Sequence, residues 1–374
     1  MPAYCTNVHP AEDLPGLLSQ LDRYAVPVRE RLAVEELPLG LWLPAPVAAG
    51  LAADRPARLR LRAELTARGL TVQTLNAFPY GGFHDQVVKG AVYRPDWADL
   101  RRLRYTTSCA TVLADLLAED AEYGSISTLP LGWRRPWTDH HDVLAVAALA
   151  AVGSALARLD RPVLLAVEPE PGCRLDTVAD AVEWLAGRVD PDRIGICLDT
   201  CHLAVSFAEP AAELARIRQA GLRVVKVQAA AALHVERPAD PASRAALAAY
   251  AEPRYLHQVR ELSTDGRVLA TDDLPDALAE LPAVGPWRVH FHLPVHRESL
   301  EAPVRPTSEV LRATLAALPG EPGGLPHIEV ETYTWSVLPA PPTDAELVAG
   351  IAAELAWVAA ALTGQPADPP VGVG

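Results

Sequence analysis

In Ile194-Gly195-Ile196-Cys197-Leu198-Asp199-Thr200-Cys201-His202, an apolar run ends in an acid, and a histidine follows three residues later. Such a run, closed by a turn, predicts a buried strand of a parallel sheet. Asp199 then lies at the carboxyl end of this strand, and His202 lies on the loop or first helical turn beyond it. Because ligands bind at that end of the strands in α/β folds, both side chains are candidates for a functional site.

Two further stretches have the same form. Val163-Leu164-Leu165-Ala166-Val167-Glu168 ends in an acid before a turn at 169–172, and His327-Ile328-Glu329-Val330-Glu331 lies near the C-terminus. Strand alternation places Glu329 and Glu331 on one face, so either could be a ligand, and Glu331 is favoured because it is nearer the carboxyl end. Three carboxylate-tipped strands and a histidine predict a divalent-metal site at the mouth of a barrel.

Strand and helix patterns alternate along the first 228 residues. The predicted strands are 3–8, 37–43, 70–76, 123–128, a strand ending at 168, a strand ending at 199, and 222–228. The predicted helices between them are 13–31, 47–68, 95–119, 139–160, 176–188 and 210–220. Strict alternation at this spacing predicts a parallel sheet with helical crossovers, and eight such units close a (β/α)8 TIM barrel.

The end of the chain complicates the strand count. After residue 228 comes a region of some sixty residues that reads as irregular, followed by strand candidates at 287–292 and 327–331. That makes nine candidates where a barrel needs eight, so one lies outside it, and the pattern does not say which. We therefore predict an α/β fold of one barrel domain, 1–363, elaborated between the seventh and last strands, with a flexible tail at 364–374.

Composition narrows the classes of partner. The net charge of −14 argues against a nucleic-acid partner, because phosphate binding depends on Lys and Arg. Neither a signal peptide nor an apolar span without charges is evident, so no membrane insertion is expected. Five scattered cysteines are typical of reduced thiols in a cytoplasmic protein. Homo-oligomer formation is left open.

Several segments carry a resemblance to known proteins. Leu198-Asp199-Thr200-Cys201-His202, with Glu168 thirty-one residues before Asp199, resembles the xylose isomerase-like TIM-barrel superfamily, which includes sugar isomerases, epimerases and endonuclease IV. Four segments look closer to one branch of it, the Ebo-type metabolite traffic proteins. They are Tyr4-Cys5-Thr6-Asn7-Val8-His9-Pro10, Leu75-Asn76-Ala77-Phe78-Pro79-Tyr80-Gly81, Val289-His290-Phe291-His292 and His327-Ile328-Glu329-Val330-Glu331-Thr332-Tyr333-Thr334-Trp335.

The resemblance implies a metal held by a Glu, an Asp, a His and a second Glu. Glu168, Asp199 and Glu331 match three of these ligands. Gln228 stands where the family often has the histidine, and His292 is the candidate to take over that position. The resemblance also implies that Glu168 and Glu331 exchange the substrate proton. The expected cation is Mn²⁺, Co²⁺, Mg²⁺ or Zn²⁺.

Polar and aromatic residues at strand ends and on the following loops are the expected substrate contacts. These are Asn7, His9, Asn76, Phe78, Tyr80, Trp133, Arg134, His202 and His257, with Phe83 and Trp137 as further cavity walls. Aromatic rings stack on the apolar faces of sugars and cyclitols. The alternative is that the aromatic loops pack on neighbouring helices and that Arg134 belongs to a solvated loop.

Three functions remain open from the sequence. The first is a metal-dependent isomerase or epimerase of a sugar, a cyclitol or their phosphates, associated through the resemblance with maturation or traffic of a secondary metabolite. The second is a non-catalytic carrier of such a metabolite on the same barrel. The third, an endonuclease IV-like nuclease, is disfavoured by the acidic charge.

Overall fold

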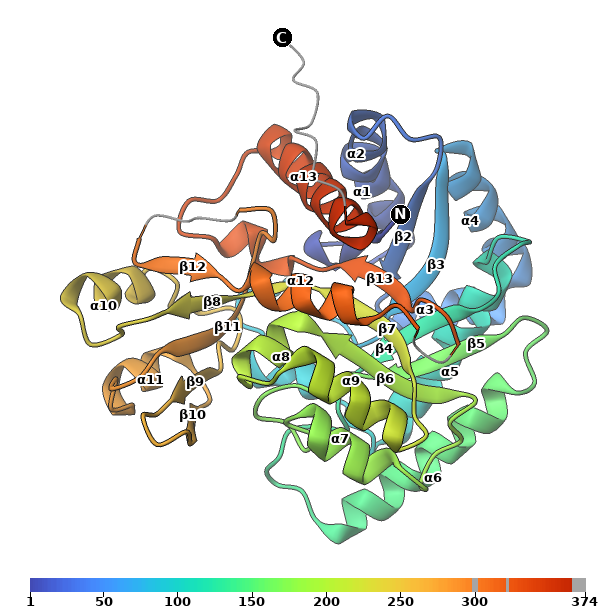
Figure 1. The fold of residues 1–374 in the computed structure, drawn as a ribbon. Coiled ribbons are helices and arrows are strands. Elements are labelled where there is room, and N and C mark those ends of the chain that lie inside the picture. Colours follow the sequence, from blue (N-terminus) through green and yellow to red (C-terminus); the bar gives the residue numbers. More distant parts are fainter. Residues whose placement is uncertain (298–301, 321–322, 365–374) are drawn as a thin grey trace.

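The computed structural model describes residues 1–297, 302–320 and 323–364. Eight parallel strands form a closed barrel with the neighbour order β1-β13-β7-β6-β5-β4-β3-β2 (Figure 1). The strands are β1 (Ala3–Cys5), β2 (Leu37–Trp42), β3 (Leu70–Asn76), β4 (Gly124–Thr128), β5 (Val163–Val167), β6 (Ile194–Asp199), β7 (Val224–Ala229) and β13 (His327–Val330). The predicted TIM barrel is confirmed.

Helices cover the outside of the barrel (Figure 1). They are α1 (Leu14–Gln20) and α2 (Val26–Arg31), joined by a π-helical turn at Leu21–Ala25, then α3 (Ala45–Ala53), α4 (Arg55–Ala67), α5 (Leu100–Leu116), α6 (Asp139–Leu156), α7 (Val178–Leu185), α8 (Thr200–Val205), α9 (Pro210–Gln219), α12 (Ser308–Ala317) and α13 (Asp344–Thr363). The helix predicted at 47–68 is two helices, because the Asp54 side chain accepts a hydrogen bond from the Ala57 backbone and caps a new start.

The sequence pattern suggested an irregular region between β7 and β13, but this region is regular. It forms a five-stranded antiparallel sheet of order β10-β9-β11-β8-β12, which lies beside the barrel (Figure 1). Its elements are β8 (Ala231–Val235), α10 (Pro241–Ala248), β9 (Val259–Leu262), β10 (Val268–Thr271), α11 (Leu274–Glu280), β11 (Trp287–Leu293) and β12 (Val304–Pro306). Of the nine strand candidates, the one at 287–292 lies outside the barrel: it is β11 and belongs to this inserted sheet.

A buried ion pair fills the barrel interior one layer below the strand ends. Lys226 Nζ on β7 lies 2.7 Å from the carboxylate of Glu329 on β13, and both side chains are wholly buried. Burial opposes the charged lysine, but the Glu329 carboxylate raises the pKa of Lys226 above its usual value. A Cβ at Gly40 on β2 would lie 1.3 Å from a Glu329 oxygen, so only glycine leaves room for this carboxylate.

The last helix, α13, closes the barrel near the N-terminus. It packs against α2, α12, β1 and β13, and Gly364 ends it in a left-handed conformation. Among the described helices, α13 is the one long and apolar enough to cross a bilayer by length and composition, although no such span was expected. Of its most apolar 18-residue stretch, 39% is buried inside the fold. Of the tail predicted at 364–374, Gly364 caps α13, and residues 365–374 lie outside the described residues.

Candidate metal centre

Three carboxylates meet at the carboxyl end of the barrel. Glu168 directly follows β5, Asp199 ends β6 and Glu331 directly follows β13, and one ligand atom from each lies within 4.8 Å of the others. Their exposed fractions are 3%, 2% and 5%. The strand ends bring together residues that lie up to 163 positions apart in the sequence (331 − 168).

Asp199 has two separate roles, one for each oxygen. Its Oδ1 accepts hydrogen bonds from the backbone amides of Cys201 at 2.6 Å and His202 at 3.1 Å, and so caps α8. Its Oδ2 finds no hydrogen-bond partner among the described residues. The cap therefore fixes the carboxylate and leaves one oxygen directed at the cluster.

His292, on β11 of the inserted sheet, lies beside Asp199 of this cluster. Its Nδ1 donates to the backbone carbonyl of Glu331 at 2.7 Å, which leaves Nε2 as the atom with the lone pair. Nε2 lies 3.8 Å from Asp199 Oδ2 and has no hydrogen-bond partner in the described part of the chain. We expected at least one of Gln228 and His292 to face the carboxylates, and His292 does.

Two amides hold Glu331 in place. Its Oε1 accepts from Asn7 Nδ2 at 2.6 Å and from Asn76 Nδ2 at 2.8 Å. Asn76 ends β3, and Asn7 follows β1. Both were expected to contact substrate, and the structure places them as supports of a carboxylate.

The electrostatics of the cluster are those of a site built for a cation. Burial raises the pKa of Glu168 well above its usual range, and the nearby Glu331 and Asp199 raise it further. Burial, followed by the charge of Asp199, raises the pKa of Glu331 to about 8. Burial lowers the pKa of His292 to about 4, so the imidazole is neutral, as a metal ligand must be.

The residues present fit a divalent cation. Glu168 Oε2, Asp199 Oδ2 and His292 Nε2 are all buried atoms without a hydrogen-bond partner among the described residues. Leaving such atoms unpaired costs roughly 1–3 kcal/mol each. A cation would give such atoms a partner, and carboxylates with one imidazole suit the expected metals.

A second cluster adjoins the first; of its residues, His202 was a predicted site residue, and Glu170 and His290 were not. Glu170, His202 and His290 each offer a ligand atom within 4.8 Å of the others, and all three are buried. Burial raises the pKa of Glu170 to about 8 and lowers that of His202 to about 3. Strand alternation in His290-x-His292 could have indicated that both imidazoles share one face of β11.

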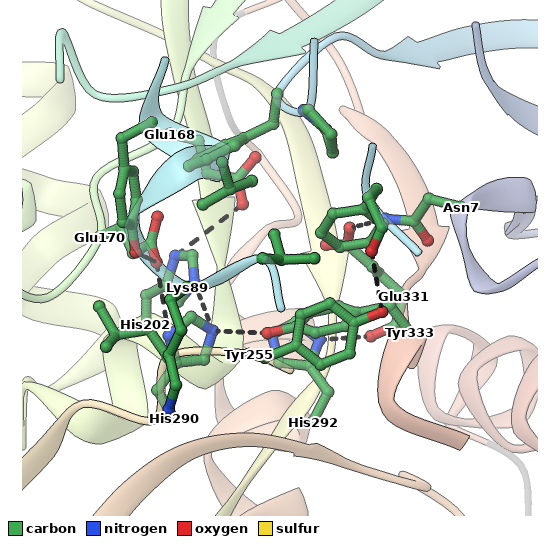
Figure 2. Close-up of a pocket in the computed structure, with 17 residues that line it drawn as sticks. Asn7, Lys89, Glu168, Glu170, His202, Tyr255, His290, His292, Glu331 and Tyr333 are labelled. Carbon is green, nitrogen blue, oxygen red and sulfur yellow. Dashed lines mark hydrogen bonds and ion pairs between the residues drawn. The ribbon is translucent and has the colours of Figure 1, made fainter. Parts of the chain in front are cut away.

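Glu168 and Glu331 of the first cluster and all three residues of the second line one pocket, whose cavity volume is about 50 Å³. Glu170, His202 and His290 gather on one side of it, and Asn7, Glu331 and Tyr333 lie on the other (Figure 2). The predicted site residues that line it are Asn7, Phe78, Phe83, Glu168, His202, His292 and Glu331. Ten lining residues were not predicted, and six of them carry polar side chains: Lys89, Tyr93, Glu170, Tyr255, His290 and Tyr333.

Other predicted site residues have partners elsewhere. Arg134 forms an ion pair with Asp272 of the inserted region, at 2.6 Å. His257 uses both ring nitrogens, on the His290 carbonyl and on the Glu252 carboxylate. Their proposed binding roles therefore lack support from the pocket geometry.

The remaining predicted residues also stand outside the pocket lining. His9 bonds the Tyr4 hydroxyl and stacks on Tyr24. The other predicted aromatics pack in the loops: Tyr80 on Tyr105, Trp133 on Tyr93 and Trp137 on His141.

Gln228, the expected ligand on β7, is wholly buried below the pocket. Neither of its amide atoms has a hydrogen-bond partner among the described residues. Its role as a metal ligand stays a prediction.

Comparison with solved structures places this fold among the xylose isomerase-like TIM barrels. Such a protein from Mycobacterium smegmatis, solved in complex with magnesium, matches 96% of this chain and 97% of its own with a TM-score of 0.52 at 12% identity. L-ribulose 3-epimerase matches 61% of this chain and 68% of its own (TM-score 0.42, 16% identity). The 3-keto-D-glucoside 4-epimerase YcjR from E. coli matches 60% and 78% (TM-score 0.40, 15% identity). No protein-family model and no curated protein matches the chain.

Proposed function

We propose that this protein is a divalent-metal-dependent isomerase or epimerase of a small polyol, sugar or cyclitol. The observation that carries the proposal is the convergence of the buried carboxylates of Glu168, Asp199 and Glu331, with His292 Nε2 at 3.8 Å from Asp199 Oδ2. The resemblance to Ebo-type proteins adds the context of maturation or traffic of a secondary metabolite. A non-catalytic carrier on the same barrel is the alternative to be tested.

The four residues Glu168, Asp199, His292 and Glu331 would hold the cation. A bound divalent ion would polarise a carbonyl and align adjacent oxygens of the substrate. The protein fixes the directions of its ligands before any substrate arrives, since Asp199 is tied to α8 and His292 to the Glu331 carbonyl. Such fixed ligands need little rearrangement at the moment of reaction.

Glu168 and Glu331 are the proposed proton-transfer pair. They follow β5 and β13, which β6 and β7 separate in the barrel, so they approach the pocket from different sides. One carboxylate can take a proton from a carbon, and the other can return a proton to the opposite face. Asn7 and Asn76 hold one oxygen of Glu331, which directs its carboxylate toward the pocket.

The pocket favours an uncharged substrate over a phosphate ester. Among the described residues that line it, Lys89 is the single Lys or Arg. Its Nζ is already paired with Asp273 at 2.5 Å. Phe78, Phe83 and Tyr333 supply aromatic surface that excludes water and can cover the apolar face of a ring. A sugar or cyclitol without phosphate is therefore the preferred class.

The test is exchange of substrate C–H hydrogen with deuterated water. The protein, loaded in turn with Mn²⁺, Co²⁺, Mg²⁺ or Zn²⁺, is incubated with ketohexoses and keto-cyclitols, and binding of each compound is measured separately by calorimetry. We expect deuterium in at least one compound that binds. If a compound binds and no metal form places deuterium in it, the carrier function replaces the isomerase.

A further inference from the structure

We propose that the pocket is covered by a lid, which opens to admit a substrate and is held shut by an ion pair between Lys89 and Asp273. The lid consists of two segments, 83–92 after β3 and 252–256 ahead of β9. Six of the seventeen residues that line the pocket belong to it, Lys89 and Tyr255 among them (Figure 2). A carrier needs such access as much as an isomerase does, so the lid goes beyond the proposed function.

The pocket is closed in this structure. Its cavity volume of about 50 Å³ has room for roughly three to five water molecules. A sugar or cyclitol ring with its hydroxyl groups is larger than that. The lid side chains that close the pocket are shielded from solvent, with exposed fractions of 6% for Phe83, 5% for Val88 and 3% for Tyr255. Entry of such a compound therefore requires part of the lining to move.

The two segments of the lid are joined to each other. The backbone amides of Val88 and Lys89 both donate to the carbonyl oxygen of Arg254, at 2.8 and 2.9 Å. The Tyr255 hydroxyl donates to the Phe83 carbonyl at 3.2 Å, and the centroids of these two rings are 5.3 Å apart. Because each segment holds the other through backbone groups, we expect them to move as one unit.

The buried residues of the lid pack in a small apolar cluster of their own. Phe83, Val88 and Tyr255 group with Trp42 and Tyr333, and this cluster is separate from the main hydrophobic core. A segment with few contacts to the core opens at a lower free energy than the strands that build the core. The lid can therefore open while the barrel stays folded.

One carboxylate holds both segments of the lid to the inserted region. Asp273 Oδ2 pairs with Lys89 Nζ at 2.5 Å, and Asp273 Oδ1 accepts from the backbone amide of His257, next to the second segment, at 3.1 Å. Lys89 has a positive φ of 39°, which a residue other than glycine keeps only where its surroundings hold it. The paired side chains of Lys89 and Asp273 are 27% and 15% exposed, so salt can screen their attraction.

Two variants break this ion pair with little other change. Lys89→Met keeps an unbranched side chain, and Asp273→Asn keeps the cap of α11, because asparagine serves at an N-cap as well as aspartate does. Arg267→Met is the matched control. It breaks the ion pair of Arg267 with Asp265, which lies in the hairpin between β9 and β10 of the same inserted region.

The first test measures access to the pocket in the full chain, without metal or substrate. Diethyl pyrocarbonate modifies neutral imidazoles, and His292 Nε2 has no hydrogen-bond partner among the described residues. Mass spectrometry of peptides gives its rate of modification relative to that of the exposed His140. We expect this relative rate to rise about 10-fold in Lys89→Met and Asp273→Asn and to stay unchanged in Arg267→Met. Added NaCl should raise it in the wild type but not in Lys89→Met.

The second test follows backbone hydrogen exchange of the same proteins by mass spectrometry. The amides of 83–92 and 252–256 should exchange together, and about 10-fold faster in the two lid variants than in the wild type. Circular dichroism checks that each variant is folded. Equal modification of His292 in the folded wild type and lid variants, or independent exchange of the two segments, would overturn the lid. Since neither test uses metal or substrate, a failed lid and a failed isomerase are told apart.

Discussion

Lys226 and Glu329 form an ion pair of 2.7 Å in the barrel interior, with no exposed surface on either side chain. The pair lies one alternation below Glu331, so it underlies the floor of the metal centre. Lys226 Nζ also donates to Ser127 Oγ at 3.2 Å on β4. The pair thus links β7 and β13 directly and reaches across the barrel to β4.

Lys226→Met should destabilise the fold by about 3–5 kcal/mol, because it leaves Glu329 as an unpaired buried charge. The double variant Lys226→Met/Glu329→Gln should recover much of that loss, since no charge remains. Urea unfolding followed by circular dichroism gives both values. A double variant that is as unstable as Lys226→Met would contradict the explanation by unpaired charge.

Asn76→Ala should weaken cation binding about 10- to 100-fold, because Asn76 orients a ligand without being one. The affected atom is Glu331 Oε1, which accepts from Asn76 at 2.8 Å. Thr74→Val is the matched control: Thr74 lies on the same face of β3, one alternation away, and bonds the Ser125 carbonyl instead. Calorimetric titration with Mn²⁺ compares the two. Equal losses of affinity would point to a general disturbance of β3.

Glu168→Gln and Glu331→Gln should each lower deuterium exchange by at least ~100-fold, the low end of general acid–base catalysis. A variant that still binds metal should keep measurable affinity for the substrate, which separates proton transfer from binding. Glu183→Gln, on the exposed face of α7, is the control. Near-normal exchange by either site variant would remove that glutamate from the proton-transfer pair.

Glu354 should make the fold less stable as pH rises. It lies within α13 and accepts from Thr332 Oγ1 at 2.6 Å and Trp335 Nε1 at 3.1 Å. Burial raises the pKa of Glu354 from 4.5 to about 7. Between these values the folded state keeps a proton that the unfolded chain has lost, so the free energy of unfolding falls as pH rises through this window.

The Glu354 contribution can be isolated with one substitution. A shift of this size corresponds to about 3 kcal/mol across the window. Glu354→Gln removes the titration, so its stability should change less with pH than that of the wild type. Urea unfolding at several pH values from 4.5 to 7.5, with chelator present, measures both slopes. Parallel slopes would show that Glu354 does not titrate there.

The barrel could be predicted because each of its main strands is visible in the sequence as a short, continuous apolar run. Asp199 and Glu168 each close a buried apolar run, and this pattern alone placed them at the carboxyl end. In the inserted sheet, only β11 was recognised from the sequence, as the strand candidate 287–292. Strand β10, Val268–Thr271, has no fully buried residue, so nothing in its four residues distinguishes it from a loop.

The parts of the site that were missed depend on contacts between distant residues. Glu170 lies in a Pro-Glu-Pro-Gly turn, which is typical of an exposed loop. Its burial comes from Tyr93 and Gln258, which lie 77 and 88 positions away. Arg134 was expected near substrate, but its partner Asp272 is 138 positions away. No local pattern reveals such partners.

His290 and His292 lie on the inserted sheet, and the carboxylates lie on the barrel. A cation bound by residues of both would therefore cross-link the sheet to the barrel, and this cross-link could be removed with the metal. Free metal at 100 times its dissociation constant would add about 2.7 kcal/mol to the joint. The free metal concentration would then set how much the cation stabilises the contact between sheet and barrel. The cation would add to a contact that apolar packing already holds, because the buried residues of the sheet belong to the same core as those of the barrel.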